Sequence, residues 1–80
     1  MDLRGNVVDN RKKILAYLLT RLNDRDPQVR LKSIQELADL GDPEALDPLE
    51  RVFRTDTEES VRNAALAAGR AIFVKQLKTR

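Results

Sequence analysis

The sequence predicts an all-α protein, a short right-handed α-α superhelix of four helices in a single domain, residues 1–80. Two observations support this fold class. Apolar residues recur at helical spacing in four successive segments, and no segment keeps the alternation that a half-buried strand requires. The chain also resembles itself at a shift of about 32 residues, which is typical of stacked helical repeats.

The first helix is expected over residues 10–22. Five apolar side chains fall within one arc of a helical wheel, whereas Lys12, Lys13 and Thr20 lie outside it. Asp9 is a suitable N-cap, because its carboxylate can accept from the free N–H groups of the first turn. The apolar arc consists of Ile14, Leu15, Leu18, Leu19 and Leu22.

The second helix is expected over residues 27–40. Asp26 can cap it, and Pro27 suits the first helical position, where the N–H that proline lacks would have no partner. Gly41 is expected to end this helix as a left-handed cap, a conformation that glycine adopts without steric cost.

A second Asp-Pro start signal begins at Asp42 and predicts a third helix over residues 43–54. Pro48 is awkward inside it, because proline cannot bond back to the preceding turn. Either the helix kinks there, or residues 43–46 form a separate turn and the helix restarts at Asp47. The apolar arc consists of Ala45, Leu46, Leu49, Val52 and Phe53.

The fourth helix is expected over residues 58–78. Glu58 and Glu59 would lie in its positive first turn, and Lys75 and Lys78 near its negative end, which is the favourable arrangement for a helix dipole. The apolar face consists of Val61, Ala65, Leu66, Gly69, Ile72, Phe73 and Leu77.

The internal repeat pairs the second helix with the fourth and the first with the third. Val29 and Arg30 match Val61 and Arg62 at the start of their helices. The later matches are Ser33 with Ala65, Ile34 with Leu66 and Leu40 with Ile72, and, after one gap, Leu15, Leu18, Leu19 and Leu22 with Leu46, Leu49, Glu50 and Phe53.

These repeats resemble the HEAT-like repeats named after phycobilisome lyases, over about residues 10–73. The resemblance implies stacked antiparallel helix pairs in B-A-B-A order, with the B helices on the concave side. Two features depart from the family pattern: the array is very short, and the last helix continues through residues 73–78 without the usual Gly-Asp stop. The residues that match in order are Asp26, Pro27, Val29, Arg30, Leu40, Gly41, Asp42, Pro43, Ala45, Pro48 and Leu49.

Composition narrows the function classes. The chain has no cysteine and no histidine, so it has no thiolate metal site, no disulfide and no histidine base. No Gly-rich phosphate loop occurs, and no apolar run is long enough to span a membrane. We therefore expect a protein that is not an enzyme, has no cofactor, and is cytoplasmic, because its polar start lacks a signal-peptide core.

Charge is segregated along the chain. The net charge is +4 over residues 1–35, −7 over residues 36–60 and +5 over residues 61–80, for a total of +2. This pattern suits either a solvated surface in which unlike segments pack together or a charged binding surface.

Arg30 and Arg62 each lie amid an apolar arc, so each charge must find partners. The structural interpretation is that each guanidinium reaches a turn and bonds an aspartate or a helix-end carbonyl of the neighbouring unit. The alternative is an anion-binding site. The resemblance favours the structural role, since the family uses an arginine at this position for packing. The candidate partners are Asp24, Asp26, Asp42 and Asp56.

The predicted function is a non-catalytic adaptor that binds another protein. One candidate surface is the B-helix face, and the other is the end of the fourth helix, which could also form a homodimer. Asp47 and Glu50 share a face three residues apart, which gives either an acidic patch or a solvated surface. The possible partner-binding residues are Lys12, Lys13, Asp47, Glu50, Arg51, Arg54, Phe73, Val74 and Leu77.

Two other functions compete with this prediction. A nucleic-acid-binding helical repeat is disfavoured, because an acidic helix separates the basic segments. No aromatic platform for base stacking is apparent either. Of the three aromatic residues, Tyr17, Phe53 and Phe73, the two phenylalanines are expected on core faces. An accessory role in bilin or phycobilisome metabolism rests on the family resemblance alone.

Overall fold

The computed structural model describes residues 3–78, with side chains from residue 10 onward. These residues form four α-helices and one 3-10 turn, and no strand occurs among them. The all-α prediction is confirmed. The elements are α1 (Leu3–Arg21), α2 (Pro27–Leu40), η1 (Pro43–Ala45), α3 (Leu46–Thr55) and α4 (Glu59–Lys78).

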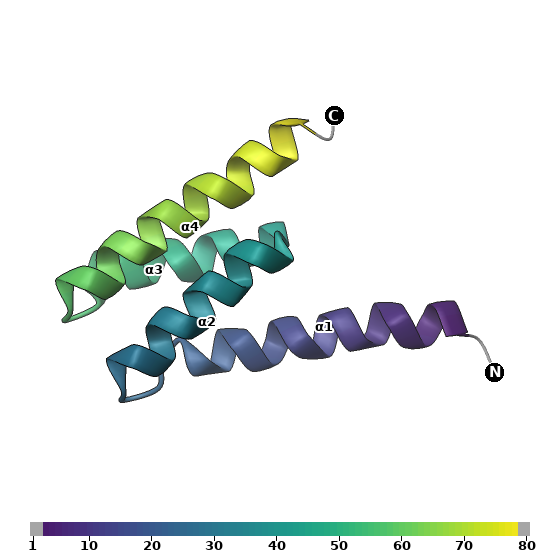
Figure 1. Cartoon of the computed structure of the whole chain (residues 1–80), viewed down its shortest axis with the longest axis horizontal. Coiled ribbons are helices and arrows are strands. Elements are labelled where there is room, and N and C mark those ends of the chain that lie inside the picture. The colour runs from purple at the N-terminus through teal and green to yellow at the C-terminus, as the bar shows by residue number, and fades with distance from the viewer. Residues whose placement is uncertain (1–2, 79–80) are drawn as a thin grey trace.

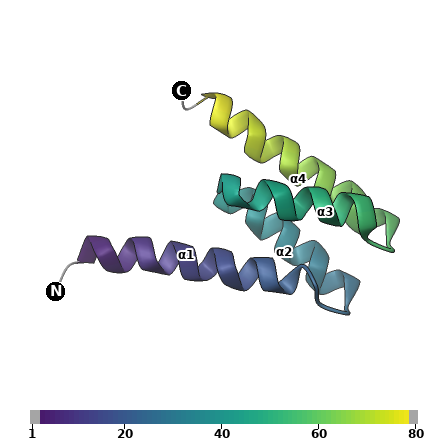
Figure 2. The ribbon, with the colours of Figure 1, turned by 180° about the vertical axis from the view of Figure 1, so that it is seen from behind.

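The helices form two hairpins, α1–α2 and α3–α4, stacked on each other. The most extensive contact joins α3 to α4, the next joins α2 to α4, and α1 packs on α2. In Figure 1, α3 lies behind α2 and α4, and Figure 2 shows it in front of them from the opposite side. The N-terminal part of α1 extends past α2, away from the other helices (Figure 1).

The start of α1 differs from the sequence prediction. The helix begins at Leu3 rather than near residue 10, so it passes through Asp9, and the predicted N-cap at that residue is wrong. The apolar pattern marks only the part of the helix that contacts α2. From residue 10 onward, its buried anchors Leu15 and Leu18 lie in the C-terminal half, and the buried Leu22 follows directly after the helix ends.

Helix α2 has both of the boundary signals that its sequence predicts. The Asp26 side chain accepts from the Gln28 N–H at 2.9 Å, with Pro27 in the first helical position. Gly41 has a φ of 72°, and its N–H donates to the Leu37 carbonyl at 3.0 Å. The left-handed backbone explains the glycine, because a side chain is strained there.

The third helix is shorter than the predicted 43–54. Asp42 caps a separate turn, η1, by accepting from the Glu44 N–H at 2.8 Å, and α3 begins at Leu46. A continuous helix is therefore wrong, and the alternative of a turn before a restart is right. Pro48 then lies in the first turn of α3, where backbone N–H groups have no partner within the helix, so a proline costs no hydrogen bond there.

The core runs between the two hairpins. Its largest fully buried apolar side chains are Ile34, Leu37, Leu49, Val61 and Ile72. Ser33 is also buried, and its hydroxyl donates to the Val29 carbonyl at 2.9 Å, so its polar atom is satisfied.

Four side chains that the wheel places on apolar faces are exposed instead. Ile14 is 49% exposed, Phe53 38%, Phe73 55% and Leu77 55%. A helical wheel shows which side of a helix is apolar, but it cannot show how far the neighbouring helix covers that side.

Candidate protein-docking surface

Arg30 joins the two hairpins. Its Nε donates to Asp56 Oδ2 at 2.8 Å and its Nη2 to Asp56 Oδ1 at 3.0 Å, which makes a bidentate ion pair. Its Nη1 donates to the backbone carbonyls of Asp24 at 2.8 Å and Arg25 at 3.2 Å. Arg30 thus clamps the turn of its own hairpin to the turn of the next.

Arg62 occupies the equivalent position in α4 but has fewer partners. Its Nη1 donates to the Asp56 carbonyl at 2.8 Å, which repeats the contact between Arg30 and the Asp24 carbonyl. No carboxylate of the described residues pairs with it. Asp26 and Asp42, which the sequence offers as arginine partners, instead cap helical segments with their side chains.

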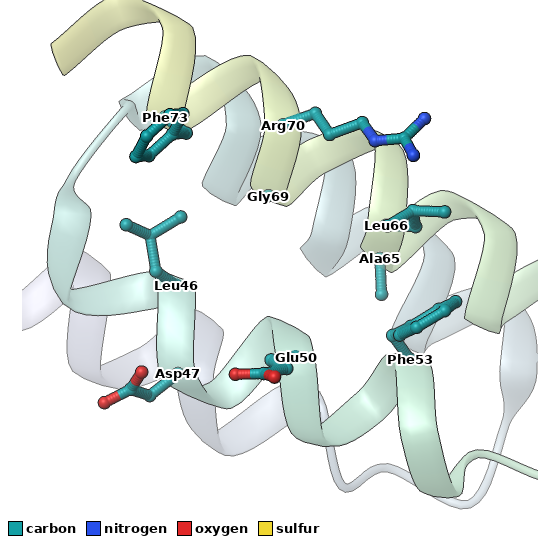
Figure 3. Close-up of a pocket in the computed structure, with 9 residues that line it drawn as sticks. All are labelled: Leu46, Asp47, Glu50, Phe53, Ala65, Leu66, Gly69, Arg70 and Phe73. Carbon is teal, nitrogen blue, oxygen red and sulfur yellow. The ribbon is translucent and has the colours of Figure 1, made fainter. Parts of the chain in front are cut away.

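An apolar groove of about 290 Å³ lies between α3 and α4 on the side away from the first hairpin. Leu46 and Phe73 point toward each other across one end of it, and Phe53 lies below Ala65 at the other end (Figure 3). We call this the open end face. Its residues are Leu46, Phe53, Ala65, Leu66, Gly69 and Phe73.

Charged side chains border the open end face. Asp47 and Glu50, which we call the acidic rim, line the groove from α3, and Arg70 borders it from α4 (Figure 3). Glu50 also accepts from Arg54 Nη2 at 2.8 Å in an exposed i,i+4 pair. The hydrogen bond and charge of Glu50 raise the pKa of Arg54 above its ordinary value.

The comparison with protein families agrees with this architecture. The profile of HEAT repeats matches residues 5–69. The chain belongs to the HEAT-repeat family. Neither the curated proteins nor the solved structures gave a match to the chain. The phycobilisome-lyase type of HEAT repeat stays a prediction.

The HEAT fold brings together residues that the sequence assigned to two separate surfaces. Asp47 and Glu50 were assigned to the B-helix face and Phe73 to the C-terminal end, yet all three line the same groove. Arg51 and Arg54 lie beside the acidic rim in a shallow polar depression.

The other predicted partner-binding residues do not join this groove. Val74 and Leu77 are exposed further along α4, 45% and 55% respectively. Lys12 and Lys13 are exposed on α1, in the other hairpin.

Sequence reasoning missed Leu66 and Gly69 of the open end face and Arg70 at its border. The internal repeat contained the signal for Leu66. Its counterpart Ile34 is 1% exposed because the α3–α4 hairpin covers it, whereas nothing in the described chain covers Leu66 to the same extent. Positions of the second hairpin that face the next unit can therefore be identified by adding the repeat shift of about 32 to the numbers of residues buried in the first hairpin.

The described residues offer little for other chemistry. No three acidic side chains within residues 10–78 gather closely enough to hold a metal ion. Along the same residues, no helix combines the length and apolar character needed to cross a bilayer.

Proposed function

We propose that this HEAT-repeat chain is a non-catalytic module that binds another protein through its open end face. HEAT repeats typically serve as scaffolds for protein interactions, and the profile match places the chain in that family. An apolar groove edged by charges has the composition of a protein-docking site rather than of a reaction centre.

One observation carries this proposal. Leu22 of the first hairpin is only 5% exposed, whereas its counterpart Phe53 in the second hairpin is 38% exposed. Repeat proteins bury the apolar faces of their units against neighbouring units. The open end face is therefore a stacking surface that the described chain does not cover.

A capture experiment tests the proposal. The wild-type chain, Phe53→Glu and Tyr17→Glu are each immobilised and exposed to a lysate of the organism that encodes the protein, and bound proteins are identified by mass spectrometry. A partner of the open end face should be captured by the wild type and by Tyr17→Glu, whose substitution lies on the opposite hairpin. It should be lost with Phe53→Glu. A partner retained equally by all three would contradict the assigned surface.

A further inference from the structure

The turns that link the helices of each hairpin are built alike. In the α1–α2 turn, Asp24 Oδ1 accepts from the Asp26 N–H at 2.9 Å. In the α3–α4 turn, Asp56 Oδ1 accepts from the Glu58 N–H, also at 2.9 Å. Each turn also places the carbonyl of its aspartate 2.8 Å from the arginine of the following helix. Asp24 and Asp56 are therefore equivalent in both sequence and geometry.

The two turns differ in what their charged groups bind. The Asp56 carboxylate forms an ion pair with the guanidinium of Arg30. No carboxylate in residues 10–78 forms such a pair with the guanidinium of Arg62. The Asp24 carboxylate has no basic partner among the same residues. Within residues 10–78, Asp24 therefore lacks a basic partner at the α1–α2 end of the stack, and Arg62 lacks a carboxylate partner at the α3–α4 end.

The two ends also match in apolar character and charge. Ile14 and Tyr17 are the large apolar side chains exposed on the first hairpin, and Phe53 and Phe73 are exposed on the open end face. Tyr17 lines a shallow depression on the outer side of α1 and α2, with Arg21 stacked over its ring at 5.2 Å. From residue 10 onward, where its side chains are described, α1 carries only basic charges, at Arg11, Lys12, Lys13 and Arg21, opposite in sign to the acidic rim.

We propose that the open end face receives the α1–α2 hairpin of a second copy of this chain. The incoming hairpin sits as α3–α4 sits on α1–α2 within one copy, so that Asp24 of the second copy accepts from Arg62 of the first. This inference rests on the proposed function, since it uses the same face, and it specifies the partner. The contact is head-to-tail, and repeated contacts would build a row of copies.

The contact between copies is weaker than the one within the chain. Lys32 and Glu36 stand on α2 where α4 has Ala64 and Ala68 at the same repeat positions. These longer polar side chains reduce the apolar area that the incoming hairpin can bury. We expect reversible association at protein concentrations of about 0.1–1 mM.

Two end-blocking variants test the geometry. Tyr17→Glu places a negative charge against the acidic rim and blocks the first hairpin, while Phe53→Glu blocks the open end face. Both side chains are exposed, so both variants should keep the wild-type helix content. If one of them does not, Tyr17→Ser and Phe53→Ser replace the pair. Sedimentation velocity is measured for the wild type, for each variant and for their equimolar mixture.

The wild-type sedimentation coefficient should rise with concentration, and each variant alone should stay monomeric. The mixture should form a dimer with one copy of each variant, because the intact hairpin of Phe53→Glu fits the intact face of Tyr17→Glu. A wild type that stays monomeric at about 1 mM overturns this inference. It does not contradict the proposed function, which the capture experiment tests separately. Dimers of Tyr17→Glu alone overturn it in favour of a symmetric pairing of two open end faces.

The ion pair has its own matched control. Asp24→Asn keeps the oxygen that accepts within the turn and removes the charge. In the Phe53→Glu chain, whose hairpin is in the contact, this substitution should weaken the mixed dimer about tenfold. In the Tyr17→Glu chain, whose Asp24 faces solvent, it should change nothing. Equal effects in both chains would contradict the pairing of Asp24 with Arg62.

Discussion

Arg30 on α2 and Asp56 in the α3–α4 turn form a bidentate ion pair across 26 positions of sequence, with N–O distances of 2.8 and 3.0 Å. Their side chains are only 11% and 7% exposed. The planar guanidinium also holds two carbonyls of its own turn, so one side chain fixes both turns together. This contact therefore joins the two hairpins at their turns, beside the apolar packing of α2 on α4.

Arg30→Ala should lower the free energy of unfolding by about 2–4 kcal/mol, because the buried Asp56 carboxylate and two carbonyls lose their donor. Arg30→Lys should recover only part of this stability, because lysine keeps the positive charge but its ammonium cannot form the bidentate pair. Urea unfolding followed by circular dichroism measures both. Arg51→Ala, at an exposed position on α3, serves as the control and should stay within about 0.5 kcal/mol of the wild type. A stable Arg30→Ala chain would show that the clamp does not hold the hairpins together.

Gly41 and Gly69 should respond to substitution by alanine in opposite directions. At Gly41 the φ of 72° strains any side chain, and a Cβ would lie 3.2 Å from the Lys75 side chain, so Gly41→Ala should destabilise the fold by about 1–2 kcal/mol. At Gly69, inside α4, a Cβ would meet nothing within 4 Å. Gly69→Ala should stabilise the fold by about 0.5–1 kcal/mol, through helix propensity. Thermal unfolding of both variants checks the signs, and a shared sign would refute the assignment.

Local chemistry made much of the fold predictable from the sequence. Asp26, Pro27 and Gly41 determine their own backbone, because caps and left-handed turns depend on one or two residues. The start of α1 was missed for a related reason. Its first turns extend past α2 (Figure 1), and the apolar arc used for the prediction begins only at Ile14, so Asp9 resembles a cap that precedes the helix.

The site was harder to predict than the fold, because it depends on what is left uncovered. Phe53 and Phe73 lie on apolar sides of their helices, which the wheel detects, but their exposure depends on the distance to neighbouring helices. The pairing of Arg30 with Asp56 likewise could not be predicted without the stacking geometry. Asp24, Asp26 and Asp42 carry the same carboxylate and are nearer to Arg30 in sequence.

Amide hydrogen exchange should find four protected segments with graded protection. Exchange should be slowest around Leu37 in α2 and between Val61 and Ile72 in α4, where the most buried side chains lie. Residues 10–14 of α1 should exchange faster, because their side chains are exposed. Far-UV circular dichroism should show mostly helix. A substantial strand signal, or uniform protection along α1, would contradict this packing.

Binding of a protein partner at the open end face should depend only modestly on salt, because the contact is mainly apolar and the charges lie at its rim. Reversal of the acidic rim, Asp47→Lys with Glu50→Lys, should weaken a partner that carries basic residues. Phe73→Ser, which leaves the buried Ile72 in place, should weaken any partner of this face. Titrations at two salt concentrations measure both effects, and a partner unaffected by both changes would bind elsewhere.

Nucleic acid should behave in the opposite way, and we expect no measurable binding to a mixed DNA duplex at physiological salt. Each phosphate contact adds about −0.9 to the slope of log affinity against log salt, so contacts from four exposed lysines would give a slope of about −3.6. Reversal of the acidic rim should then tighten binding, because it removes repulsion of phosphate. Fluorescence anisotropy with a labelled duplex measures the slope for the wild type and the reversed variant. Micromolar affinity with a steep slope and tighter binding by the variant would replace the protein-docking function with a nucleic-acid one. The four lysines are Lys12, Lys13, Lys75 and Lys78.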